Sequence, residues 1–127
     1  MKDLDKPNDA LPFSEIGAYA DNFSAETVIL RMIEGLGFRY YWATDGLRDV
    51  DLSYKPSEDS RSSLDVLEHI YGLTDMVIYA FQDKEYPTGT KYEMSFTEYR
   101  AKTLLNLKKM SDMISEGLKV SGVTVKI

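Results

Sequence analysis

The sequence predicts an all-α fold built from three long amphipathic helices. Apolar residues recur every three or four positions along three separate segments, which is the spacing of one face of an α-helix. Each segment begins with a serine that can cap a helix, at Ser24, Ser62 and Ser95. The segments are separated by stretches that contain Pro56, or Pro87 and Gly89, and these stretches interrupt helices. Together these observations favour a helical bundle.

The composition narrows the class of protein. A chain of 127 residues with 43% hydrophobic residues is long enough for one domain, which we expect to span residues 1–127. A net charge of −6 argues against a nucleic-acid partner and against a basic membrane anchor. The chain has no cysteine, no run of about 18 apolar residues and a polar start. We therefore expect a cytoplasmic protein without disulfides or membrane spans.

The first helix is predicted over residues 24–47, after a flexible stretch at 1–12 and an ordered lead-in at 13–23. The lead-in is expected to pack on the bundle through its large apolar residues, Phe13, Ile16, Tyr19 and Phe23. The predicted core face recurs at helical spacing and comprises Val28, Met32, Leu36, Tyr40 and Ala43, joined by Ile29, Ile33 and Leu47. Gly35 and Gly37 inside this pattern indicate close packing of a neighbouring helix, a slight kink, or a backbone approach to a ligand.

The second helix is predicted over residues 62–83. Ser62 and Asp65 resemble a capping box at its start. Its apolar stripe comprises Leu64, Leu67, Ile70, Tyr71, Thr74, Val77, Ile78 and Phe81. In the connection before it, over residues 48–61, Leu52 and Tyr54 are expected to point inward.

The third helix is predicted over residues 95–117. Ser95 and Glu98 form a capping box, and Gly117 suits the C-terminal cap. Its core face comprises Phe96, Tyr99, Thr103, Leu104, Leu107, Met110, Met113 and Ile114. The tail, residues 120–127, alternates apolar and polar residues, which is typical of a short strand or an extended arm.

The apolar faces of these helices are wide and suit a four-helix bundle better than a closed three-helix one. The fourth layer would come from a partner, from the lead-in, or from sequence missing here. A three-helix piece with an exposed apolar face predicts a homodimer.

Three segments carry a resemblance to a known family. They are the long first helix, Arg31 to Leu47, the connection with Leu52 and Lys55-Pro56, and a second helix that opens Ser62-Ser63-Leu64-Asp65-Val66-Leu67-Glu68-His69-Ile70. In this respect the chain resembles the DinB-like superfamily of bacterial four-helix-bundle proteins. The resemblance covers roughly residues 24–82, and the third helix only generically. It implies an up-and-down bundle, shortened at its C-terminus or a fragment, whose fourth helix is missing or supplied by a partner.

The resemblance also implies an activity. Better-known members of that family bind a divalent metal through one histidine on the second helix and two on the last helix. Some act as thiol transferases or hydrolases on small-molecule substrates, and they are often dimers. His69 matches the second-helix ligand, and no other histidine is present. The resemblance therefore implies an incomplete site for zinc, nickel or iron at His69.

The residues around His69 leave two interpretations. His69 lies at the edge of the apolar stripe, and Asp65, four residues earlier on the same helix face, could pair with its imidazole. It is then either a boundary histidine or a metal ligand that needs further donors. The candidates for further donors, or for a partner that orients the imidazole, are Glu34, Asp65 and Glu68, or carboxylates of a second subunit.

Two functions thus follow from the sequence. One is a metal-dependent enzyme of the family's kind, and the other is a non-catalytic helical module for dimerisation or small-molecule binding. The cluster Tyr40-Tyr41-Trp42 fits either a pocket wall or, more commonly, core and interface. The chain supplies only one of the three histidine ligands that the resemblance implies, which favours the non-catalytic module for this chain.

Overall fold

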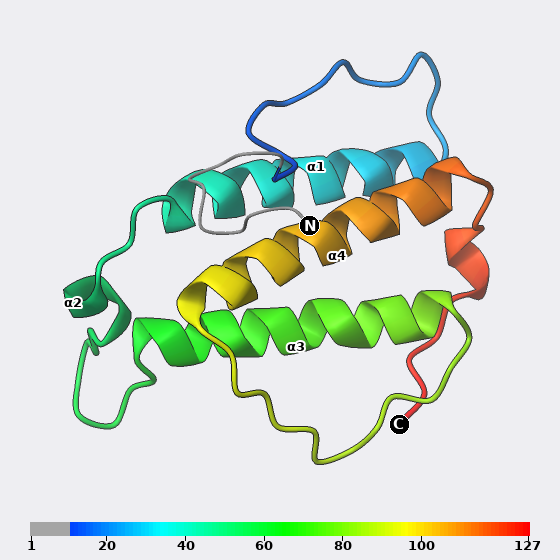
Figure 1. The fold of residues 1–127 in the computed structure, drawn as a ribbon. Coiled ribbons are helices and arrows are strands. Elements are labelled where there is room, and N and C mark those ends of the chain that lie inside the picture. The colour runs from blue at the N-terminus through cyan, green and yellow to red at the C-terminus, as the bar shows by residue number, and fades with distance from the viewer. Residues whose placement is uncertain (1–10) are drawn as a thin grey trace, which may run out of the picture.

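The computed structural model describes residues 11–127, and there the fold is all-α, as predicted (Figure 1). Its elements are α1 (Ala25–Thr44), α2 (Asp49–Leu52), α3 (Ser63–Phe81), α4 (Phe96–Ser115) and the 3-10 helix η1 (Val120–Gly122). The three long predicted helices are confirmed to within three residues at each end. Residues 11–127 contain no β-strand, only an isolated bridge between Glu85 and Lys126. The flexibility predicted for 1–12 concerns mostly residues outside the described range, although Leu11 itself packs against the core.

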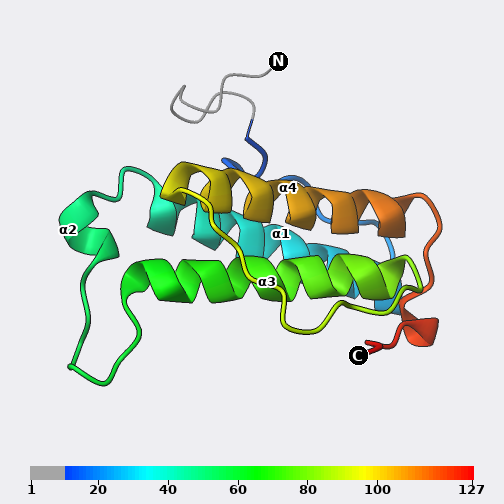
Figure 2. The ribbon, with the colours of Figure 1, turned by 60° about the horizontal axis from the view of Figure 1, so that its bottom comes forward.

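Helix α4 lies between α1 and α3 and contacts both along their length (Figures 1 and 2). The hydroxyl of Tyr99 donates to the Glu68 carboxylate at 3.0 Å, and the Asn106 amide donates to Thr74 Oγ1 at 3.1 Å. Residue numbers on α3 and α4 therefore rise together, so these two helices are parallel. The predicted up-and-down order is wrong at this step.

The connection between α3 and α4 explains the parallel order. Residues 82–95 run back along the bundle before α4 begins, instead of making a tight turn (Figure 1). Tyr92 and Tyr86 hold this crossover against α3: the ring of Tyr92 meets that of Tyr71 edge-on at 4.9 Å, and the ring of Tyr86 meets that of Tyr79 at 5.2 Å. Helix α1 runs antiparallel to both α3 and α4.

The predicted serine caps are all confirmed. The side chains of Ser24, Ser62 and Ser95 each accept a hydrogen bond from the backbone N–H three residues later. Asp65 and Glu98 complete capping boxes by accepting from the backbone N–H of the cap residue. These local signals position the starts of the three helices.

The core face of α1 agrees with the prediction in part: Ile33 and Tyr40 are buried as predicted, and Ile29 and Leu47 pack against the core. Its buried residues are Ile33, Gly37, Tyr40, Tyr41 and Thr44. Val28, Met32 and Leu36 are 47%, 64% and 50% exposed, and Ala43 is exposed as well. The helix carries two apolar faces, and α4 packs against the face that contains the tyrosines.

Of the predicted anchors of the lead-in, Phe13 packs against the core, and the Tyr19 ring lies 5.9 Å from the Arg31 guanidinium of α1. Phe13 is half-buried and contacts both core clusters. Ile16, Tyr19 and Phe23 are exposed, which contradicts the prediction that they pack against the bundle. Polar contacts to α1, from Gly17 to Arg31 and Glu34 and from Ser14 to Trp42, hold the rest of the lead-in.

Of the two residues expected to point inward from the connection, only one does. Leu52, on the short helix α2, is buried, whereas Tyr54 is exposed because the chain turns outward after α2. The tail is neither a regular strand nor simply extended. It forms η1, whose Val120 N–H donates to the Glu26 carboxylate at 3.0 Å, and then pairs with the crossover at the single bridge.

Candidate functional site

His69 lies in a cleft of about 510 Å³ between α3 and the crossover. The cleft is lined by Arg61, Asp65, Glu68, His69, Gly72, Leu73, Met76, Tyr86, Thr90 and Tyr92. His69 is exposed and makes no hydrogen bond or ion pair with the described residues. On the opposite wall the hydroxyls of Tyr86 and Tyr92 bond to each other, and burial raises the pKa of Tyr92.

The expected pairing of Asp65 with His69 is wrong. The Asp65 carboxylate accepts from the Ser62 backbone N–H at 3.1 Å, and this bond is the main cause of its lowered pKa. A carboxylate in the first turn of a helix is stabilised by the free N–H groups there, so it turns toward the helix start. Glu68, the other nearby acid, accepts from the Tyr99 hydroxyl at 3.0 Å.

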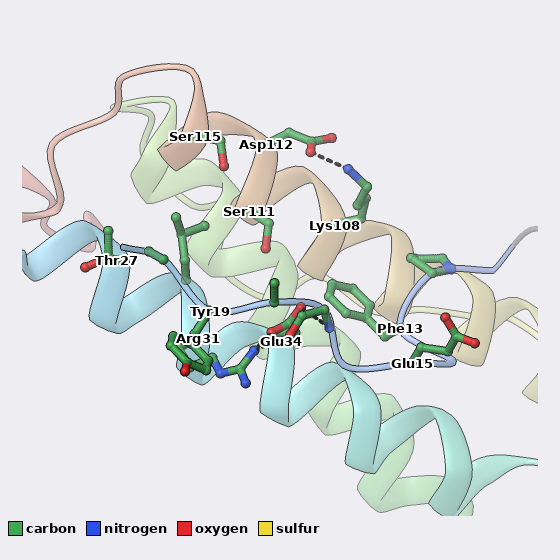
Figure 3. A pocket seen from close by; sticks show the side chains of 15 residues that line it. Phe13, Glu15, Tyr19, Thr27, Arg31, Glu34, Lys108, Ser111, Asp112 and Ser115 are labelled. Carbon is green, nitrogen blue, oxygen red and sulfur yellow. Dashed lines mark hydrogen bonds and ion pairs between the residues drawn. The ribbon is translucent and has the colours of Figure 1, made fainter. Parts of the chain in front are cut away.

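Glu34 belongs to a different place in the fold. It lines a hollow of about 560 Å³ between the lead-in, α1 and α4, where it pairs with Arg31 (Figure 3). It also accepts from the Gly17 backbone N–H at 2.9 Å, while Arg31 donates to the Gly17 carbonyl at 2.8 Å. Its role is to hold the lead-in, and it does not converge on His69.

The residues around His69 do not fit a metal site as they are placed. A stable zinc-type site needs three or four donors that converge on one point. Within residues 11–127, no group of three or more histidine and carboxylate side chains lies close enough to hold an ion. The two acids nearest His69 are engaged by Ser62 and Tyr99. Further ligands would have to come from elsewhere.

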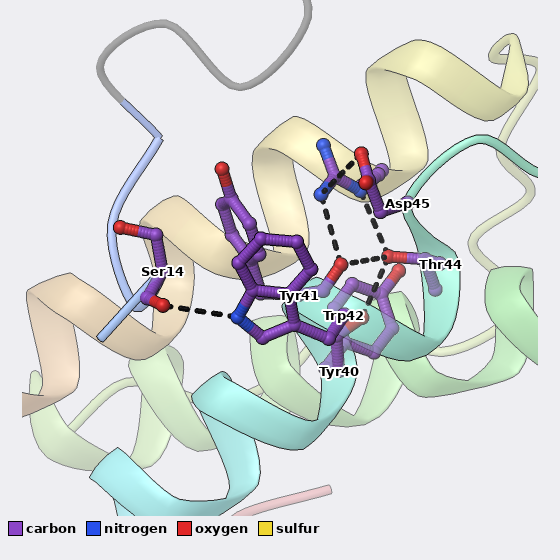
Figure 4. Close-up of polar contacts among 7 residues, drawn as sticks. Ser14, Tyr40, Tyr41, Trp42, Thr44 and Asp45 are labelled. Carbon is purple, nitrogen blue, oxygen red and sulfur yellow. Dashed lines mark hydrogen bonds and ion pairs between the residues drawn. The ribbon is translucent and has the colours of Figure 1, made fainter. Parts of the chain in front are cut away.

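The aromatic cluster at the end of α1 serves the core and the lead-in (Figure 4). Tyr40 and Tyr41 are buried, and the Trp42 indole N–H donates to the Ser14 carbonyl at 2.9 Å. The buried guanidinium of Arg100 donates to the Tyr41 carbonyl at 2.9 Å and to Thr44 Oγ1 at 2.8 Å, and it lies 4.7 Å from the Tyr41 ring centre. This network joins α1 to α4, and no local pattern in the sequence indicates that Arg100 is buried there.

The two outer helices both leave an apolar stripe uncovered. We name the pair of stripes the open face: Val28, Met32, Leu36 and Ala43 of α1 with Val66, Ile70, Leu73 and Val77 of α3. Val66 and Leu73 are 42% and 46% exposed, close to the values on α1, and Ile70 and Val77 are half-buried.

Helix geometry places both stripes on one side of the molecule. At about 100° per residue, each stripe is rotated by roughly 100–120° from the residues that face α4, in the same rotational sense. Because α1 and α3 are antiparallel and flank α4, equal rotations bring the stripes to the same side. A shared apolar hollow of about 490 Å³ confirms this, since Ala43 and Leu47 line it together with Val66 and Ile70. Most of the lead-in lies on the other side of α1, and its end borders the open face, where Tyr19 and Phe23 line a hollow of about 300 Å³ with Val28 and Met32.

Comparison of the sequence with protein-family models and curated proteins, and of the structure with solved structures, finds no match. The described helices include none that is long and apolar enough to cross a membrane. The resemblance to the DinB-like superfamily therefore stays a prediction from the sequence.

Proposed function

We propose that the protein is a non-catalytic helical module that self-associates through the open face. The observation that carries this proposal is the pair of exposed apolar stripes on one side of α1 and α3. Contiguous apolar surface of this kind marks interaction sites in soluble proteins. A homodimer would cover both stripes and supply the layer that a three-helix bundle lacks.

The exposure of these residues sets the expected strength of the dimer. Covering a half-exposed Val, Leu or Met contributes on the order of 1 kcal/mol, so two copies of the open face gain on the order of 10 kcal/mol. Association itself costs about 4–15 kcal/mol in lost freedom. Even at the low end of that cost the net gain is about 6 kcal/mol, so we expect a weak dimer, with a dissociation constant of tens of micromolar or more, which separates on dilution.

Substitutions on the open face test the proposal. Leu36→Glu and Leu73→Glu each place a charge on the open face, and each should give a monomer by light scattering at concentrations where the wild type is dimeric. Leu105→Glu is the matched control, because Leu105 is 46% exposed on the outer side of α4. Equal masses for all four proteins would contradict the proposal.

A metal-dependent thiol transferase or hydrolase, which the resemblance implies, stays a second prediction. The observation that favours it is the open cleft in which His69 is exposed beside Asp65 and Glu68. Its test is the metal content per chain of untagged wild-type protein and of His69→Ala, with circular dichroism of both. Near-stoichiometric zinc, nickel or iron that disappears in His69→Ala would support it. Absence of bound metal after soaking would reject it.

A further inference from the structure

We propose that the cleft between α3 and the crossover binds the ammonium group of a small organic amine. The ammonium group lies beside Gly72, between Glu68 and Asp75. The apolar part of the amine lies on Leu73 and Met76, which line the same cleft. A volume of about 510 Å³ is in the range of small-molecule sites. This site goes beyond the proposed self-association, because it is formed within one copy of the chain.

The crossover brings two tyrosine hydroxyls close to α3 at Gly72. A Cβ atom at Gly72 would lie 3.5 Å from Cε2 and 3.9 Å from the hydroxyl oxygen of Tyr92. That hydroxyl bonds to the hydroxyl of Tyr86. Because only one of the two donates in this bond, the pair keeps lone pairs that can accept further hydrogen bonds. The pair therefore offers acceptors to the N–H groups of an ammonium ion.

Two carboxylates flank Gly72 on α3. Glu68 lies four residues before Gly72 and Asp75 three residues after it, so both lie on the same helix face as Gly72, each within about 6 Å. Glu68 is exposed in the cleft, and it accepts from the Tyr99 hydroxyl through Oε2 only. Asp75 is half-buried, and its carboxylate makes no hydrogen bond or ion pair with the described residues. Both carboxylates therefore retain free acceptor capacity.

The negative charge of these two acids reaches the tyrosine hydroxyls. Burial is the largest cause of the raised pKa of Tyr92 and of Tyr71, and the charge of Asp75 adds to it in both. Burial also raises the pKa of Tyr99, with a further contribution from Glu68. The phenols therefore stay protonated, and the negative potential around them favours a cation over an anion.

The arginine of the cleft lies at its other end. The pKa of Asp65 is lowered chiefly by its bond to Ser62, and the nearby charge of Arg61 adds to this effect. Arg61 precedes Gly72 by eleven residues, which is roughly 16 Å along a helix. Its charge is therefore offset by Asp65 and is remote from the ammonium position.

The remaining basic groups do not neutralise the site. Burial raises the pKa of Asp75, and Lys109 of α4 opposes this shift without forming an ion pair with Asp75. His69 is exposed on the same wall, and a neutral imidazole can itself accept from an ammonium ion. The end of the cleft around Gly72 thus carries more negative than positive charge, which selects amines over organic acids.

Three probes of similar shape test which charge the cleft prefers. Phenethylamine, phenethyl alcohol and hydrocinnamate carry an ammonium, a hydroxyl and a carboxylate group on the same phenylethyl body. Each is titrated into isotope-labelled protein in the presence of a chelator, and binding is followed by the NMR signal of the Gly72 amide. Phenethylamine should bind at least about tenfold more tightly than the other two, because hydrogen bonds between charged groups are the stronger ones.

Substitutions of the two acids test their roles. Glu68→Gln removes the charge and keeps an amide oxygen that can accept from Tyr99. It should weaken the binding of phenethylamine about tenfold and leave that of phenethyl alcohol unchanged. Asp75→Asn should act in the same direction. Glu116→Gln, at an exposed position at the end of α4, changes the net charge equally and should change neither affinity. Circular dichroism checks that each variant is folded.

Several outcomes would overturn the inference. They are equal affinities for phenethylamine and phenethyl alcohol, tighter binding of hydrocinnamate, and no response of Gly72 to millimolar phenethylamine. Equal effects of Glu68→Gln and Glu116→Gln would also overturn it, because net charge alone would then explain the preference. Leu36→Glu, which tests self-association, lies on α1 outside this cleft and should bind phenethylamine as the wild type does. Amine binding and self-association can therefore fail independently.

Discussion

The packing of Phe13 against Gly37 predicts that Gly37→Ala changes the free energy of unfolding in one direction when the Phe13 ring is present and in the other when it is absent. A Cβ atom at Gly37 would lie 2.5, 2.7 and 2.8 Å from three ring atoms of Phe13. These separations are far inside van der Waals contact, so Gly37→Ala must displace the ring. Overpacking of this kind costs about 1–3 kcal/mol, which exceeds or cancels the roughly 1 kcal/mol that alanine contributes to a helix interior.

Removing the ring reverses the sign. In a Phe13→Ala background the space beside Gly37 is free, so Gly37→Ala should stabilise the protein by about 1 kcal/mol. The coupling free energy between the two positions should therefore be about 1–3 kcal/mol. Urea denaturation of the four proteins of the cycle, followed by far-ultraviolet circular dichroism, measures it. Trp42 fluorescence reports the lead-in separately, through the indole bond to Ser14.

Gly35→Ala is the matched control for this cycle. The nearest atom to a Cβ at Gly35 is the movable end of the Arg39 side chain, at 3.1 Å. The change in unfolding free energy caused by Gly35→Ala should therefore be the same in the wild type and in the Phe13→Ala variant. A coupling free energy below about 0.5 kcal/mol between positions 13 and 37 would refute the docking of the lead-in into the notch at Gly37.

Two further predictions concern stability. Arg100→Met removes a buried guanidinium that bonds Tyr41 and Thr44, and it should lower the free energy of unfolding by about 2–3 kcal/mol, whereas Lys102→Met on the exposed side of α4 should change it little. Chemical denaturation of both variants measures this difference, and equal effects would contradict the network. The lowered pKa of Asp65 stabilises the fold above about pH 4, and this contribution is lost as the pH falls through the folded-state pKa. Asp65→Asn should therefore flatten the dependence of the unfolding free energy on pH below about 4. The same pH dependence in Asp65→Asn and in the wild type would contradict the stabilising role of the Asp65 carboxylate at the start of α3.

The local signals of the sequence were enough to find the helices. The capping boxes at Ser62 and Ser95 and the breakers Pro56 and Pro87 depend only on nearby residues, so they could be recognised without the fold. The direction of α4 could not be found in this way. It depends on the path of residues 82–95, and a loop of that length can either turn back or cross over.

The buried face of α1 shows a second limit of the sequence. Periodicity favoured the stripe through Met32 and Leu36, which is rich in purely apolar side chains. The structure buries Ile33 and Tyr40 of the predicted face together with Tyr41 and Thr44, because the Tyr41 carbonyl and the Thr44 hydroxyl accept hydrogen bonds from Arg100. In the sequence, the presence of two apolar faces on this one helix is the feature that indicates a further interaction surface.

The candidate site was predicted only in part. Sequence spacing placed Asp65 and Glu68 beside His69, and all three do line one cleft. Spacing along one helix could not show that Ser62 and Tyr99 engage the two acids, since the second bond comes from α4. Sequence spacing also could not show that Glu34 lies apart from His69, because Glu34 is held by the lead-in in a different hollow of the fold.

The molar mass of the wild-type chain over a dilution series tests the central claim most directly. If the open face is a self-association surface, light scattering should approach twice the 14.5 kDa chain mass at high micromolar concentration. The mass should fall toward that of one chain on dilution. A mass of one chain at every concentration, in a protein whose circular dichroism shows intact helices, would contradict the account.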